Sequence, residues 1–313
     1  MWLAARDGAG CVFATGSAEA AQRHREATAS LREQIVATLA VLVAAACHAC
    51  WNALLKLDVE PMVATTLLAI ASGIISLPLV LALGAPAPAS WPYLAASVVI
   101  HTLYYFALAQ AYRHGDLGQV YPIARGSAPL MTALLAAFVL GERLSPLAWA
   151  GVIVLACGIL LLALRGGRTS RAFDPKSVGF ALLTSLTITS YTIVDGFGAR
   201  AANAPVVFTA WLFVLSAIVV GVWGLLRPTP LYATTSLRHW LLAMGGAALS
   251  VAAYVIAIWA MTVAPIALVA ALRETSVLFA ALLSTLLLRE PLVPARVVSA
   301  IIVLGGALLL RLS

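Results

Sequence analysis

Two arginines, each set in a long apolar run, are the residues of this sequence best suited to bind an anion. Arg125 and Arg273 lie 148 residues apart, and the same spacing separates Glu142 from Glu290. The two halves of the chain therefore repeat one pattern. A guanidinium group presents a planar fork of N–H donors that matches a carboxylate or a phosphate. The repeat predicts a site for an acidic group, built from corresponding positions of the two halves.

The composition places these arginines inside a membrane. Hydrophobic residues make up 63% of the chain and charged residues only 10%, whereas soluble domains carry about 25% charged residues. A bilayer core requires about 20 apolar residues per helix. By that rule the sequence predicts ten transmembrane helices, near residues 35–55, 62–83, 92–112, 118–140, 146–164, 177–197, 205–226, 238–262, 266–288 and 295–312.

The ten predicted helices divide into two groups of five. Five is an odd number, so the second group must enter the membrane from the opposite side, which is the plan of inverted-repeat transporters. Aromatic residues repeat as well, since Trp51 corresponds to Tyr191 and Tyr105 to Tyr254. We predict an all-α integral membrane protein with a polar, disordered N-terminal extension (1–34), a first repeat (35–164), a basic linker (165–176) and a second repeat (177–313).

The position of each arginine in its helix suggests its partners. Both lie seven residues into their segments, about 10 Å below opposite faces of the bilayer core. Asp195 lies near the face where the 266–288 segment begins, so we expect it to pair with Arg273. Glu274 points about 100° away from Arg273 and should serve another neighbour. Arg125 has no acid at its depth in its own half, so we expect it to bind the acidic group of the substrate. The alternatives are that it pairs with Glu274 across the repeats or binds backbone carbonyls.

Other polar and aromatic side chains are expected to line a cavity around these arginines. Pro122, flanked by two glycines, makes the 118–140 segment the best candidate for a broken helix, with a simple kink as the alternative. Either histidine could couple protons to transport, or could simply be hydrogen-bonded within the bundle. The candidate substrate-binding residues are Arg125, Tyr121, His48, Trp51, Asn52, His101, Tyr105, Tyr254 and Arg273, with Asp195 and Glu274 as a gate or ion pair.

Other classes of function find little support in the sequence. The net charge of +7 is scattered over helix ends and does not form a nucleic-acid-binding face. Cys47 and Cys50 flank His48 in an order that differs from haem attachment, so we predict no metal and no cofactor. An integral-membrane enzyme would have to use His48, His101 and Asp195, which show no catalytic spacing. A membrane scaffold would not need buried arginines.

Three motifs resemble those of EamA-type carriers of the drug/metabolite transporter superfamily. They are His48-Ala-Cys-Trp-Asn52, Tyr121-Pro-Ile-Ala-Arg-Gly126 and Gly141-Glu142-Arg143. The resemblance spans residues 35–312. It implies two inverted five-helix repeats, a cavity built mainly by the first, third, fourth, sixth, eighth and ninth helices, and cytoplasmic termini. The distribution of basic loop residues mildly opposes that orientation. The first segment lacks the acid that related cationic-drug carriers use.

The residues and the resemblance together predict a secondary transporter. We expect an exporter that moves a small polar metabolite with an acidic group, such as an amino acid or organic acid, by alternating access in a bacterial inner membrane. The alternative substrate is a lipid-linked or phosphonate-type compound. The expected partners are this small molecule and the lipid bilayer, with no nucleic acid.

Overall fold

The computed structural model describes residues 32, 34–51, 54, 61–114, 117–139, 141–166, 174–226, 235–276, 278–279, 282–283 and 294–313. The predicted extension (apart from 32 and 34), most of the predicted linker, and Asn52 lie outside these residues. So does the side chain of Tyr121.

The first half contains a helix at Gln34–Trp51, α2 (Pro61–Leu83), the 3₁₀ turn η1 (Pro88–Ser90), α3 (Trp91–His114), α4 (Leu117–Val139) and α5 (Pro146–Gly166). The second half contains α6 (Pro175–Ala202), α7 (Pro205–Leu225), α9 (Leu237–Val263), α10 (Ile266–Arg273) and α12 (Pro294–Arg311).

Proline begins five of these helices: α2, α5, α6, α7 and α12. The first N–H of a helix has no partner within the helix, so proline loses nothing there and its fixed φ favours the helical turn. At α6 the carboxylate of Asp174 also accepts from the N–H of Lys176 at 3.0 Å. The same helix ends at Asn203, whose left-handed φ of 51° stops the chain from continuing. These signals explain why the predicted spans start where they do.

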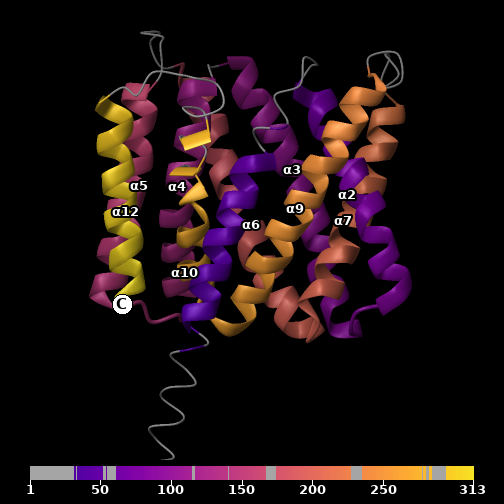
Figure 1. The fold of residues 1–313 in the computed structure, drawn as a ribbon, viewed down its shortest axis with the longest axis horizontal. Helices are drawn as coiled ribbons and strands as arrows, with labels where there is room; N and C mark the ends of the chain where they lie inside the picture. The colour runs from indigo at the N-terminus through magenta and orange to yellow at the C-terminus, as the bar shows by residue number, and fades with distance from the viewer. Residues whose placement is uncertain are drawn as a thin grey trace, which may run out of the picture.

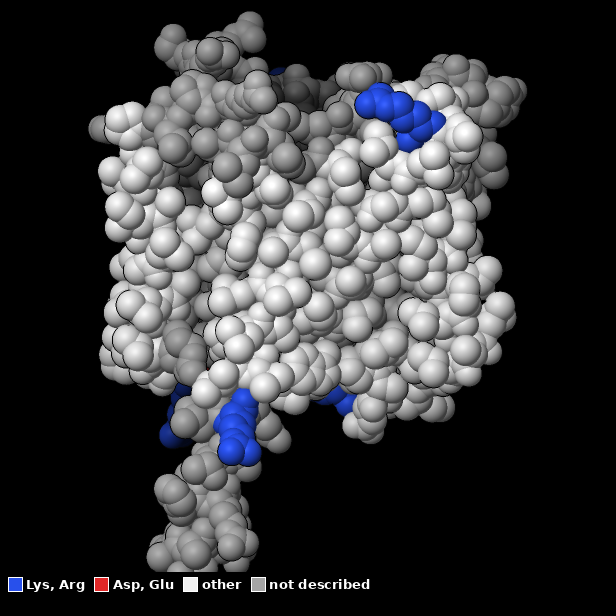
Figure 2. All heavy atoms as spheres, in the orientation of Figure 1, with Lys and Arg blue, Asp and Glu red and all other residues white. Residues whose placement is uncertain are grey.

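The helices run roughly alongside one another in one bundle, some in front of others in the view of Figure 1. Five of them are long and apolar enough to cross a membrane: Gln34–Trp51, Val63–Leu83, Pro175–Ala202, Pro205–Gly224 and Leu237–Val263. Figure 2 shows lysine and arginine only at the two ends of the visible face, with an uncharged band between them. This distribution fits a protein whose middle lies in hydrocarbon and whose ends lie at the two membrane surfaces.

The two halves pack as related units. The last helices of the halves, α5 and α12, lie against each other, and so do the second helices, α2 and α7. The contact between α2 and α9 has its counterpart in the contact between α3 and α7. The predicted fold class, an all-α membrane protein made of two five-helix repeats, is confirmed.

Glycine allows a close approach of two backbones between α5 and α12. A Cβ added at Gly306 would lie 2.6 Å from the backbone nitrogen of Leu155, and one at Gly151 would lie 2.9 Å from that of Leu310. Backbones meet this closely in membranes because van der Waals packing between small residues replaces the hydrophobic effect. The α5–α12 pair therefore holds the outer ends of the two repeats together.

The helix break occurs in the ninth span and not, as predicted, in the fourth. Helix α4 is continuous from Leu117 to Val139 although Pro122 is its sixth residue. A proline inside a helix removes one backbone hydrogen bond and can bend the helix without ending it, which is the alternative to a broken helix. By contrast, α10 ends at Arg273. The N–H groups of Glu274 and Thr275 bond only three residues back, and the Thr275 hydroxyl donates to the Leu272 carbonyl at 2.7 Å. Such local bonding by threonine competes with the helix.

Candidate functional site

A cavity of about 250 Å³ lies between the two halves, bounded by side chains from eight helices. Seven of the predicted substrate-binding residues line it: His48, Trp51, His101, Tyr105, Arg125, Tyr254 and Arg273. Three of the pairs that the sequence repeat relates, Arg125 with Arg273, Trp51 with Tyr191 and Tyr105 with Tyr254, meet at this one cavity. The expected helices contribute, and so do α2 and α7, through Thr65, Ser72 and Ser216 among others.

Arg125 is charge-paired with an acid from the other half of the chain. Its Nε lies 3.0 Å from Oε2 of Glu274, and both side chains are almost fully buried. Its Nη2 also lies 3.2 Å from Nε2 of His48. The pairing with Glu274 is the alternative that the sequence left open, and it crosses the interface between the repeats. The break after α10 places Glu274 in a turn, where its side chain can reach α4.

Arg273 has a different environment. It is only 5% exposed and lines the cavity. Among the residues that the structure describes, it forms neither an ion pair nor a hydrogen bond, and its Nε is buried without a partner. Its guanidinium carbon lies 5.9 Å from the ring centre of Tyr254, a cation–π distance. A buried cation without an anion is unfavourable, so this site is suited to receive one.

The expected ion pair between Asp195 and Arg273 is not formed. Instead, the hydroxyl of Tyr254 donates to Oδ2 of Asp195 at 2.5 Å, while the ring of the same tyrosine lies beneath Arg273. The phenol thus stands between the two charged groups and contacts both. Sequence position alone could place Asp195 and Arg273 near the same face of the membrane, but it could not show that Tyr254 separates them.

Aromatic rings form the opposite wall of the cavity. The ring of His101 stacks on Tyr191 with centres 4.2 Å apart, and Tyr104 meets Tyr191 edge-on at 5.9 Å. Phe213 meets Tyr254 in the same way at 5.6 Å. Tyr191 and Phe213 were missing from the predicted site. The correspondence of Tyr191 with Trp51 in the repeat was the signal that could have added it.

His48 is held by two donors. Trp51 Nε1 approaches its Nδ1 at 3.2 Å, and Arg125 approaches its Nε2 at 3.2 Å. Tryptophan and arginine can only donate, and a neutral imidazole can accept at only one nitrogen. In either neutral tautomer, the ring nitrogen without a hydrogen accepts from its neighbour, so one of the two contacts is a hydrogen bond. A protonated His48 has no acceptor nitrogen and would lose this hydrogen bond. This arrangement makes His48 a structural neighbour of Arg125 and a poor proton carrier.

Glu142 joins the two repeats at the other end of α10. Its carboxylate oxygens accept from the N–H groups of Ile266 at 3.1 Å and Ala267 at 3.4 Å. The first N–H groups of a helix lack partners within it, and a carboxylate there also offsets the helix dipole. The helix that Glu142 caps belongs to the opposite half and carries Arg273.

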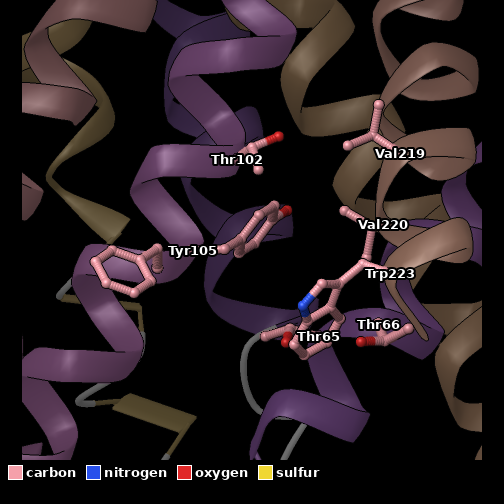
Figure 3. A pocket seen from close by; sticks show the side chains of 8 residues that line it. Thr65, Thr66, Thr102, Tyr105, Val219, Val220 and Trp223 are labelled. Carbon is pink, nitrogen blue, oxygen red and sulfur yellow. The ribbon is translucent and has the colours of Figure 1, made fainter. Parts of the chain in front are cut away.

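A second pocket of about 280 Å³ lies beside the cavity and shares Thr65 and Tyr105 with it. In Figure 3, Thr102 and Tyr105 face Val219, Val220 and Trp223 across this pocket. Its walls are mainly apolar, and two of its side chains, Phe106 and Trp223, are 56% and 44% exposed on the outer surface of the bundle. The pocket therefore lies between the polar cavity and the surface that would face lipid.

Comparison with known proteins agrees with this architecture. Among curated proteins, none matches the chain. Among solved structures, one described as "Crystal structure of protein" aligns with a TM-score of 0.72 over 89% of this chain and 96% of its own, at 19% identity. At that identity the likeness concerns the fold. The sequence profile of the EamA-like transporter family matches residues 34–164 and again residues 175–312. With one match in each half, covering most of its length, the chain belongs to the EamA-like transporter family.

Proposed function

We propose that this transporter carries a small metabolite with an acidic group and that Arg273 binds that group. The family makes the protein a multi-pass membrane transporter. The observation that supports the acidic substrate is the difference between the two cavity arginines, because Arg125 is already neutralised by Glu274 whereas Arg273 has no anionic partner among the described residues. A carboxylate could occupy the fork of Arg273 with two charge-assisted hydrogen bonds.

The cavity also supports a small substrate. Its volume of about 250 Å³ suits a molecule the size of an amino acid or a short organic acid. Serine and threonine hydroxyls from α2, α7 and α9 line it beside the aromatic wall, so polar groups of a substrate can be hydrogen-bonded. An amino acid or organic acid, as expected from the sequence, remains our first choice of substrate.

Alternating access is the mechanism that we infer for the movement of this substrate. Helix α10 belongs to the second repeat, but the first repeat holds both of its ends: Glu142 caps its first turn and Arg125 binds Glu274 after its last. Rocking of one repeat against the other must strain or exchange these contacts. Arg273 lies between them, so movement of α10 would carry the bound anion with it.

A second candidate is an amphiphilic anion, such as a lipid-linked acid. The observation in its favour is the apolar pocket at Tyr105, which borders the cavity and reaches the outer surface of the bundle. An apolar chain could lie in that pocket while the acidic head contacts Arg273. Export and an inner-membrane location, both expected from the sequence, remain predictions.

Counterflow in proteoliposomes tests the proposal. Vesicles loaded with unlabelled L-alanine, L-glutamate, succinate or a lysophospholipid would be diluted into the same compound with a radiolabel. We expect one of the small acids to exchange, and Arg273→Gln to reduce exchange at least tenfold. Arg273→Lys keeps the charge but loses the planar fork of donors, so its exchange rate should lie between those of wild type and Arg273→Gln.

The matched control is Arg200→Gln. Arg200 donates to the carbonyl oxygen of Met261 at 2.9 Å, near a helix end and away from the cavity. This variant should exchange the substrate at the wild-type rate. Unchanged exchange in purified, folded Arg273→Gln would refute the assignment, and exchange of the lysophospholipid alone would favour the amphiphilic candidate.

A further inference from the structure

Asp195 is a fully buried carboxyl group that forms no ion pair with any of the described residues. It lies in α6 with an exposed fraction of 0%. One oxygen, Oδ2, accepts from the hydroxyl of Tyr254, whereas Oδ1 has no partner among the described residues. A buried, ionised carboxylate with so few partners is strongly unfavourable. Ionisable groups kept inside a membrane despite this penalty commonly bind transported ions or protons.

The groups around Asp195 come from its own helix and three others. His101 of α3, Arg273 of α10 and Tyr191 of α6 interact with it electrostatically, and its carboxyl group is a hydrogen-bond partner of the Ser97 and Tyr254 hydroxyls. His101 Nδ1 lies 2.9 Å from the carbonyl oxygen of Ser97, which can only accept, so Nδ1 carries the hydrogen. Helices α4 and α7 also pack on α6. Within the described part of the chain, neither directs a titratable side chain to Asp195.

Two side chains that line the cavity lie beside Asp195. Asp195 itself does not line the cavity, but His101 and Tyr254 do. The hydroxyl of Tyr254 contacts Asp195, and its ring lies edge-on to His101 with centres 6.2 Å apart. Tyr254 can therefore pass a proton between the cavity side and the carboxyl group by donating and accepting at one oxygen.

We propose that Asp195 binds the proton that moves together with the substrate. The proposal rests on the anion site at Arg273. An ionised Asp195 would repel the substrate's acidic group and would share with it the attraction of one cation, Arg273. A proton on Asp195 removes both effects, so the proton and the anion favour each other's binding, and by linkage the effect is reciprocal. The proton comes from water on one side, forms an O–H bond on the carboxyl group, and leaves to water on the other.

This coupling has a consequence for direction. When the substrate and the proton share a direction, the larger of their two gradients decides which way both travel. Efflux of an accumulated metabolite would carry protons out with it, whereas an inward proton gradient would drive uptake. In a competitive arrangement the proton would displace the substrate, which requires both to bind the same carboxylate. Here the acidic substrate binds Arg273 and the proton binds Asp195, so the two do not compete.

Infrared titration of the purified protein in nanodiscs tests the proton site without any substrate. The C=O stretch of a protonated carboxylic acid should be present at neutral pH, disappear as the pH rises, and be absent in Asp195→Asn. The control is Asp174→Asn, the same substitution at the half-exposed cap of the same helix, which should retain the band. If Asp195→Asn retains the whole band, the proposal is wrong.

A second variant guards against misfolding of Asp195→Asn. Tyr254→Phe keeps the ring beneath Arg273 but removes the hydroxyl that contacts Asp195. The band assigned to Asp195 should then shift in frequency, because its hydrogen bond is lost. An unshifted band in Tyr254→Phe would overturn the assignment.

A transport assay distinguishes failure of the proton site from failure of the proposed function. With the small acid that exchanges in counterflow, wild-type vesicles should accumulate the acid when a pH gradient is imposed. Asp195→Asn should exchange it in counterflow but lose the gradient-driven accumulation. Retained accumulation in this variant would refute the coupling while leaving Arg273 intact. If none of the panel is exchanged, the proposed function fails, and the infrared titration still decides the proton site.

Discussion

Arg125 and Arg273 occupy corresponding positions of the two repeats and line the same cavity, yet Glu274 pairs with Arg125 and not with its own sequence neighbour Arg273. The two repeats are thus chemically unequal at their centre. One arginine supports the fold by joining the halves, and the other is available to an anion.

The ion pair between Arg125 and Glu274 should be needed for stability. Removing one partner of a buried pair leaves the other uncompensated and costs about 3–5 kcal/mol. We expect Arg125→Gln and Glu274→Gln each to lower the free energy of unfolding by about this amount. The double variant should lower it by less than the sum of the two single changes. Unfolding by denaturant in mixed micelles measures all three. Strictly additive losses would show that the two side chains act independently.

Arg273 should show the opposite behaviour. Because Arg273→Gln removes a buried charge that has no anionic partner among the described residues, it should leave the unfolding midpoint unchanged or raise it, while substrate exchange falls. The same micelle assay, run beside Arg125→Gln, gives the comparison. A loss of stability as large as that of Arg125→Gln would mean that Arg273 has a structural partner.

Glu142 should stabilise the first turn of α10. Loss of a helix cap costs about 0.5–2 kcal/mol, so Glu142→Ala should lower stability by that amount. It should also speed hydrogen exchange at the amides of Ile266 and Ala267, which Glu142 accepts from. The neighbouring substitution Arg143→Ala is the control and should leave both amides protected. Equal exchange rates in wild type and Glu142→Ala would argue against the cap.

The contact between α5 and α12 should tolerate no side chain at Gly306. Gly306→Ala would place a Cβ 2.6 Å from the Leu155 backbone, so the helices must separate and stability should fall by about 1–3 kcal/mol. At the adjacent Gly305 an added Cβ meets nothing within 4 Å. Gly305→Ala should therefore be neutral or stabilising by up to about 1 kcal/mol. Equal thermal stability of the two variants would contradict this packing.

Much of the fold could be predicted because its causes are local. Long apolar runs must become helices in lipid, and prolines such as Pro146 and Pro205 set where helices begin. The 148-residue repeat identified Arg125 and Arg273 as related cavity residues, since inverted repeats bring corresponding positions to one central site. The predicted cavity residues that the structure describes were therefore found without knowledge of any contact.

The partners of those residues depended on tertiary structure. No glycine or proline signals the break after Arg273, which arises when Thr275 bonds back to Leu272 and leaves Glu274 free to reach across to Arg125. Likewise, Tyr254 reaches both Asp195 and Arg273 only because α9 packs against both α6 and α10. Sequence period and composition determine which residues lie at membrane depth. The ion-pair partner of Arg125, Glu274, comes from the opposite half of the chain. The distance between two such side chains depends on how the helices pack and cannot be read from the sequence.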